Sequence, residues 1–159
     1  MIIQKNFLKL DDYNKLKEVI FSKHFPWFYS NAAVNCDKSY FQFTHNFISY
    51  QNVSPTLKIV QPLLDKIKPP YVERIKANLT TQTSKIIETG THEDNKKDYY
   101  KSSIFFLNNC DGYCRIGDTK IKSEDNKLLT FNSSQLHAGS TCTDASRRIV
   151  INLVYSYKR

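Results

Sequence analysis

Two stretches in the first half of the chain have the hydrophobic spacing of α-helices. In the first, apolar residues recur at intervals of three and four, as Tyr13, Leu16, Val19 and Ile20. Residues at these intervals share one face of a helix. Asp11 or Asp12 is a suitable N-cap. The helix should end near His24, because Pro26 follows and the residue before a proline disfavours helical geometry.

A second helix is expected to begin at Ser54-Pro55, which is a capping residue followed by proline at the first helical position. Its apolar face is formed by Leu57, Val60, Leu64 and Ile67. Pro62 should kink or shorten this helix. Pro69-Pro70 should end it.

The remaining chain has the two-residue alternation and the short apolar runs of β-strands. Residues 1–9 alternate weakly and residues 40–47 alternate clearly. Further strands are expected in succession at 71–79, 84–88 leading to His92, 102–107, 113–116, 119–122, 128–131 and 148–157. Asp111-Gly112 is a strong turn signal within this series.

Two helices followed by about eight short strands predict a mainly β (α+β) domain with the helices packed on one face. Short antiparallel strands separated by turns are typical of a jelly-roll or double-stranded β-helix, a cupin-like barrel whose mouth can surround one metal. Ten Phe and ten Tyr, against one Met and four Gly, favour the same fold class. We expect one domain over 1–159, with helical support over about 10–68 and the β-helix core over about 71–157.

The cysteines and the N-terminal segment indicate a cytoplasmic protein. The four cysteines are Cys36, Cys110, Cys114 and Cys142. None forms a Cys-x-x-Cys pair, so free thiols are expected rather than a zinc site. The first residues lack a charged segment followed by a long apolar stretch, and no apolar window reaches membrane-spanning length.

The formal net charge of +8 permits a nucleic acid or another acidic partner. The basic residues are scattered among apolar positions, however, and no run of five or more like charges occurs. Charge alone therefore names no partner.

His92, Asp94 and His137 are the candidate metal ligands. His92 and Asp94 lie two apart, so on a strand both side chains point to one face. An apolar strand and a turn follow Asp94, and another strand precedes His137. Two histidines and one carboxylate are the facial triad of non-haem Fe(II) oxygenases, which leaves coordination positions open for substrate and dioxygen. A closed zinc site would need a fourth ligand, and the sequence offers none nearby.

Arg148 opens the last expected strand, where alternate residues share a face. Arg148 and Asn152 should look into the barrel mouth, and a guanidinium there can hold a carboxylate in bidentate fashion. Arg147 should point to the opposite face. His24, at a helix end, and His45, in an aromatic strand, are expected to be structural.

Several segments occur together in an order that carries a family resemblance. They are Arg74–Leu79, His92–Asp94, Ile104–Asn108, Asp111–Tyr113, Leu128–Phe131, His137–Ser140 and Arg147–Asn152, preceded by Pro26–Tyr29. This set covers about half of the chain. It resembles the iron(II)- and 2-oxoglutarate-dependent oxygenases, specifically the small prolyl-4-hydroxylase-like proteins of phage and marine microbial genomes.

The resemblance implies a double-stranded β-helix in which His92, Asp94 and His137 hold Fe(II) and form the catalytic centre. Arg148 would anchor 2-oxoglutarate, with Asn78, Thr80 and Asn152 as further cofactor-binding residues. The implied reaction is hydroxylation of a C–H bond with O2, coupled to decarboxylation of 2-oxoglutarate to succinate, with ascorbate as a possible additional reductant. Peptidyl-proline hydroxylation is the family default. The implied location is the cytoplasm, that of the host if a phage encodes the protein.

Two departures from the family pattern concern the co-substrate. Phe106 and Thr80 stand where related enzymes often carry a tyrosine, and phenylalanine cannot donate that hydrogen bond. A non-catalytic β-helix that binds a metal or nucleic acid is therefore the alternative hypothesis. A peptide, a nucleic acid and a metabolite all stay open as the primary substrate, because fold and metal centre do not fix it. No membrane partner is expected.

Overall fold

A large antiparallel sheet forms the frame of the protein. The computed structural model describes residues 1–31 and 40–158. The sheet has the strand order β1-β9-β6-β11-β5-β3-β2, and β4 pairs with β3. The bounds are β1 Ile2–Gln4, β2 Phe28–Ser30, β3 Gln42–Ser49, β4 Asn52–Val53, β5 Tyr71–Thr81, β6 Tyr100–Phe106, β9 Lys127–Asn132 and β11 Arg147–Ser156.

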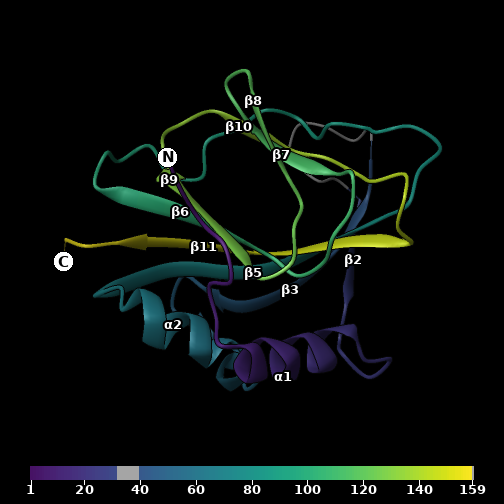
Figure 1. Ribbon diagram of the computed structural model, residues 1–159. Helices are drawn as coiled ribbons and strands as arrows, with labels where there is room; N and C mark the ends of the chain where they lie inside the picture. The colour runs from purple at the N-terminus through teal and green to yellow at the C-terminus, as the bar shows by residue number, and fades with distance from the viewer. Residues whose placement is uncertain (32–39, 159) are drawn as a thin grey trace.

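A small antiparallel sheet with the order β10-β7-β8 faces the large one (Figure 1). Its strands are β7 Tyr113–Ile116, β8 Thr119–Lys122 and β10 His137–Gly139. The helices lie on the other side of the large sheet, so the molecule has three layers (Figure 1). They are α1 Leu10–Phe21, the 3₁₀ helix η1 Leu57–Val60 and α2 Gln61–Ile67.

Alternate side chains of β11 pack into two different hydrophobic clusters of the interior. Ile149, Ile151 and Leu153 belong to the larger core, which also contains Ile20 of α1 and Leu63 of α2. This arrangement confirms that the apolar face of the last strand packs against the helices. Complete burial of such a side chain contributes about 1.5–3 kcal/mol, so this face fixes which side of β11 is turned toward the small sheet.

The opposite face of β11 contributes to a second, smaller cluster. Val150 packs there with Ile104 and Phe106 of β6 and with Cys114 and Ile121 of the small sheet. The polar members of the same β11 face, Arg148 and Asn152, are also buried. The space between the two sheets is therefore lined partly by apolar side chains and partly by the polar side chains of Arg148 and Asn152.

Both expected helices are present, but their ends differ from the sequence prediction. The N-cap of α1 is Lys9 rather than Asp11 or Asp12, which instead lie in the first turn, where a carboxylate interacts favourably with the helix dipole. Pro62 was expected to kink or shorten the second helix. The segment is divided into η1 and a short α2 that begins at Gln61, so the prediction of a shortened helix is confirmed. Pro62 lies in the first turn of α2, where its missing N–H has no helical partner to lose.

Two strand predictions also need correction. The strand expected at 40–47 is β3, but β2 and β4 pair with it between α1 and α2, so the order is not two helices followed by strands. Residues 82–99 form no strand and contact their neighbours through isolated bridges at Gln82, Glu88 and His92. Wide irregular loops of this kind have no hydrophobic period that would mark them in the sequence.

Cys110, Cys114 and Cys142 are free and buried, as expected, and Cys36 lies outside the described residues. Within the described ranges, no helix is long and apolar enough to cross a membrane.

Candidate functional site

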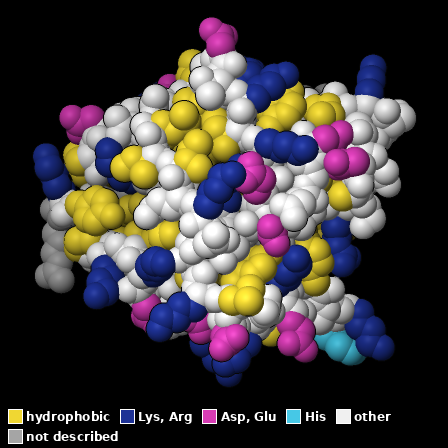
Figure 2. Space-filling view, in the orientation of Figure 1, with side chains coloured by type: hydrophobic (Ala, Val, Ile, Leu, Met, Phe, Trp, Pro, Cys, Tyr) yellow, Lys and Arg dark blue, Asp and Glu magenta, His cyan; other side chains and the backbone are white. Residues whose placement is uncertain are grey.

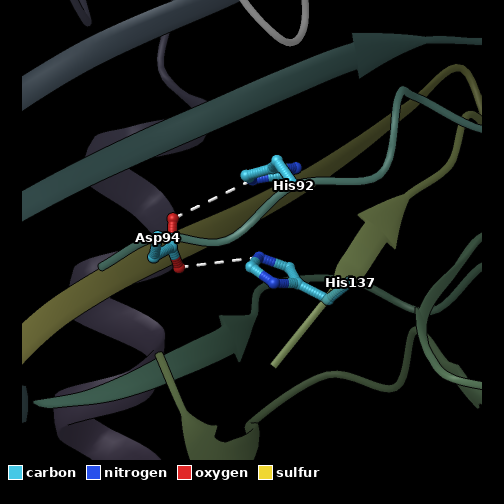
Figure 3. Close-up of side chains that lie close together, drawn as sticks. All are labelled: His92, Asp94 and His137. Atoms are coloured by element: carbon cyan, nitrogen blue, oxygen red, sulfur yellow. Dashed lines mark ion pairs between the residues drawn. The ribbon is translucent and has the colours of Figure 1, made fainter. Parts of the chain in front are cut away.

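His92, Asp94 and His137 come together between the two sheets (Figure 3). His92 and His137 form an antiparallel bridge in which each backbone N–H donates to the other's carbonyl at 3.0 Å. His92 Nε2 lies 3.9 Å from Asp94 Oδ1, and His137 Nε2 lies 3.5 Å from Asp94 Oδ2. All three ligand atoms lie within 4.8 Å of one another. The two-residue spacing thus brings the ligands together although His92 is not on a strand.

The second nitrogen of each imidazole is held by a backbone carbonyl. His92 Nδ1 lies 3.2 Å from Gly90 O, and His137 Nδ1 lies 3.0 Å from Gln135 O. A carbonyl only accepts, so each Nδ1 carries the proton and the lone pair of each Nε2 is directed toward Asp94. Fixing the tautomer in this way is characteristic of histidines that bind a metal. The donor set therefore fits a divalent transition metal.

Asp94 is held ionised by its neighbours. Its side chain is 1% exposed, yet Ser102 Oγ donates to Oδ2 at 2.7 Å and Arg74 forms an ion pair with Oδ1. Asn152 Nδ2 lies 3.3 Å from Oδ2 and 3.4 Å from Oδ1. Burial raises the pKa of the carboxyl group, but Arg74, His137 and Ser102 together outweigh burial and lower this pKa below its usual value.

Burial, and then the neighbouring His137, lower the pKa of His92. A lowered pKa keeps the imidazole neutral at physiological pH, which is the form that binds a metal.

A cavity of about 370 Å³ runs from these ligands to Arg148. Arg148 is 5% exposed, and burial lowers the pKa of its guanidinium. Its Nη1 lies 3.4 Å from Ser140 O, and its Cζ lies 5.7 Å from the centre of the Phe106 ring. No described acidic residue forms an ion pair with it. A buried cation without an anion is costly, so this end of the cavity is suited to an anionic ligand.

Five buried side-chain atoms in the described part of the chain have no hydrogen-bond partner. They are Arg74 Nε, Asn78 Oδ1, Thr80 Oγ1, Arg148 Nε and Asn152 Oδ1. All five residues line this one cavity. Because buried polar groups in native proteins nearly always find a partner, their convergence indicates a polar ligand in the cavity.

The register of β11 agrees with the sequence prediction. Arg148 faces the cavity opposite Thr80 of β5, whereas Arg147 lies on the other face with its Cζ 4.8 Å from the Phe21 ring centre of α1. Asn78 and Thr80 also line the cavity. Asn152 lines the same cavity, and its amide Nδ2 also contacts Asp94.

The remaining two histidines are not part of the site. His24 is exposed, and His45 is buried between Pro26 O and Thr56 Oγ1 at 2.9 and 2.7 Å. Sequence reasoning missed Arg74 and Lys76 as cavity residues. The signal was present, since both share an alternation face of β5 with Asn78 and Thr80.

Gly112 leaves room for Arg148. A Cβ atom at this glycine would lie 2.6 Å from Thr141 O and 2.7 Å from Arg148 Cδ. Gly112 does not have a positive φ, so glycine is required here for the close approach of Thr141 and Arg148.

We expect Gly112→Ala to displace the Arg148 side chain. Overpacking of this kind costs about 1–3 kcal/mol, so the melting temperature should fall and the affinity for a carboxylate ligand of Arg148 should weaken. The matched control is Gly117→Asn, because Gly117 has φ +55° and open space around it, and asparagine tolerates that φ. A Gly112→Ala protein as stable as the control would contradict this account of the glycine.

The fold is that of known oxygenases. A prolyl hydroxylase from Trichoplax adhaerens, in complex with a peptide of the hypoxia inducible factor oxygen degradation domain, superposes with TM-score 0.70 at 14% identity, over 99% of this chain and 84% of that chain. A Pseudomonas putida prolyl-4-hydroxylase gives 0.66 at 13%, over 99% and 92%. A 2OG-Fe(II) oxygenase family oxidoreductase from Burkholderia pseudomallei gives 0.64 at 13%, over 94% and 79%.

No protein-family model matches the sequence, and no curated protein sequence matches it. The structural likeness confirms the predicted double-stranded β-helix with helices on one face.

Proposed function

We propose that the protein is an Fe(II)- and 2-oxoglutarate-dependent dioxygenase that hydroxylates a C–H bond of its primary substrate and releases succinate. The observation that carries this proposal is that one cavity is lined by both the candidate metal ligands and Arg148. A His-Asp-His set whose Nε2 lone pairs are available to a metal lies in it together with a buried arginine that has no anionic partner among the described residues. The shared fold with 2OG-Fe(II) oxygenases supports the same conclusion.

His92, Asp94 and His137 would hold the iron, which supplies activation of O2 and of the co-substrate when bound. Asp94 contributes the one anionic ligand of this set. Ser102 and Asn152 orient its carboxylate, and partners of this kind typically change metal affinity 10–100-fold when removed.

Arg148 would bind the far carboxylate of 2-oxoglutarate. Its guanidinium can form a charge-assisted, bidentate pair that satisfies the unpaired Nε. Thr80 lies opposite Arg148 in register, and its unpaired hydroxyl can donate to the same carboxylate. Thr80 thereby supplies a hydroxyl at a position where related enzymes often use tyrosine.

Phe106 contacts the Arg148 guanidinium through its ring and not through a hydrogen bond. The Phe106 ring beneath Arg148 cannot donate a hydrogen bond, but it can stabilise the cation through its π face. Ile104 and Val150 line the same cavity as Arg148 and the metal ligands. These apolar side chains exclude water and so strengthen the electrostatic contacts within the site.

The peptide-bound neighbour supports a peptidyl, and by family default prolyl, substrate for this chain as well. The free thiols of Cys110, Cys114 and Cys142 support a cytoplasmic location, which is that of the host cell if a phage encodes the protein.

The face of the molecule in Figure 2 does not favour a nucleic-acid-binding module. Lys and Arg side chains are scattered over the face in Figure 2, with acidic and uncharged groups between them. Arg148 points into the interior instead of toward solvent. Nucleic acid binding through phosphates needs a continuous basic surface.

The test is release of succinate by the purified protein. With Fe(II), 2-oxoglutarate and air, succinate should form, and its formation should stop when iron is removed with a chelator or when oxygen is excluded. Titration of 2-oxoglutarate into the anaerobic Fe(II) protein should also give saturable binding with one molecule per chain. A protein that binds iron but neither binds nor consumes 2-oxoglutarate would overturn the proposal.

A further inference from the structure

Lys76 is a cavity cation that the proposed reaction does not use. It lies on β5 opposite Asn152 of β11, and the amide of Asn152 contacts Asp94. The Lys76 side chain is half-buried and lines the cavity. Its ammonium forms no hydrogen bond or ion pair with any described residue. Lysine is seldom removed from water without a partner, so its place beside the metal ligands calls for an explanation.

Lys76 and Arg148 stand at different ends of the cavity. Arg148 pairs in register with Thr80, and Lys76 precedes Thr80 by four residues. At the usual rise of a strand, this separation is about 13 Å along β5. The proposed anchor of 2-oxoglutarate is Arg148, so the proposed binding of the co-substrate does not use Lys76.

The charges of the cavity leave room for a further anion. Three fixed cations line it, Arg74, Lys76 and Arg148, against the two carboxylates of Glu93 and Asp94. A divalent metal adds two positive charges and a dicarboxylate co-substrate cancels two. One positive charge is then uncompensated in a partly dehydrated site, where charges interact more strongly than in water.

Arg74 is less suited than Lys76 to bind that anion. Its guanidinium already forms an ion pair with Asp94 Oδ1. The Lys76 ammonium has three donors and, among residues 1–31 and 40–158, no hydrogen-bond or ion-pair partner. Burial, followed by the repulsion of Arg74, lowers the pKa of Lys76 to about 8, and a bound anion would raise this pKa again because it favours the charged form.

We propose that Lys76 binds an anionic group, a carboxylate or a phosphate, on the primary substrate and thereby sets which C–H bond lies next to the metal. This inference rests on the proposed function and narrows it, since it makes the substrate an organic anion. Lys76 is then a specificity-determining residue, distinct from the co-substrate anchor Arg148.

The experiment uses the full-length protein loaded with Zn(II), which binds the same ligands without turnover, and saturated with 2-oxoglutarate. Acetate and inorganic phosphate are titrated into this complex by calorimetry. At least one should bind, and Lys76→Met should weaken its affinity about tenfold or more, as expected for loss of a charge-assisted hydrogen bond. Lys76→Arg should retain most of the affinity. The preference between the two probes distinguishes a carboxylate site from a phosphate site.

The matched control is Lys58→Met, which removes the same charge from an exposed position outside the cavity and should leave probe binding unchanged. Lys76→Gln serves as a second variant if the melting temperature of Lys76→Met shows that it is unfolded. Binding of neither probe to the wild-type complex, or binding that ignores Lys76→Met, would overturn this inference alone. Failure of 2-oxoglutarate itself to bind would overturn the proposed function, and this inference with it.

Discussion

Asp94→Ala should eliminate binding of Fe(II) and reduce succinate release to background. Asp94 is the one anionic member of the three-residue set, and its loss leaves the positive charge of Arg74 unpaired beside the metal position. Loss of a mere supporting partner costs 10–100-fold in metal affinity, so loss of this ligand should cost more than about 100-fold. Anaerobic calorimetry with Fe(II) measures the affinity, and circular dichroism checks that the sheets persist.

Asp98→Ala is the matched control for Asp94→Ala. Asp98 is an exposed carboxylate four residues further along the same loop, so its removal should leave both iron binding and turnover unchanged. His92→Ala and His137→Ala should resemble Asp94→Ala, and His24→Ala, at an exposed histidine, should be silent. An Asp94→Ala protein that still binds one iron and consumes 2-oxoglutarate normally would contradict the assignment of the metal site.

The parts of the site that sequence could predict are those governed by short-range rules. Alternation on a strand separated Arg148 from Arg147 correctly, because the apolar set beginning at Ile149 had to face a core. The two-residue spacing of His92 and Asp94 put both side chains on one side even though the segment pairs only through an isolated bridge. The prediction that these two side chains lie close together was therefore correct, although the segment is not the strand that was predicted.

Contacts across the sheets could not be predicted in the same way. Asn152 shares a face with Arg148 and lines the same cavity, as alternation predicted, but alternation could not predict that its amide contacts Asp94. Which end of the cavity each residue occupies depends on the register of β5 against β11 and on the path of residues 82–99, and neither leaves a periodic signal. Lys76 shares an alternation face of β5 with Asn78 and Thr80, but alternation alone could not show that this face lines the cavity, because the residues that surround it are distant in sequence.

Arg148→Ala should raise the apparent Michaelis constant for 2-oxoglutarate at least about tenfold, with little change in iron affinity. A hydrogen bond to a charged group contributes about 1.5–3 kcal/mol, and each 1.4 kcal/mol corresponds to roughly a factor of ten in affinity. Arg148 is not a metal ligand, so iron binding provides an internal reference for the fold of the variant. Steady-state succinate release at varied 2-oxoglutarate measures the effect. Arg148→Lys should recover only part of it, because an ammonium cannot form the bidentate pair.

Arg147→Ala is the control, because Arg147 lies on the face of β11 that is turned toward α1 and away from the cavity. Arg147 packs over Phe21 of α1, so its loss should cost about 0.5–1 kcal/mol of stability and leave the Michaelis constant for 2-oxoglutarate unchanged. If the two alanine variants exchanged effects, the register of β11 would be wrong by one residue. If neither changed the response to 2-oxoglutarate, Arg148 would not be the co-substrate anchor, and its burial without an anion would need another ligand to explain it.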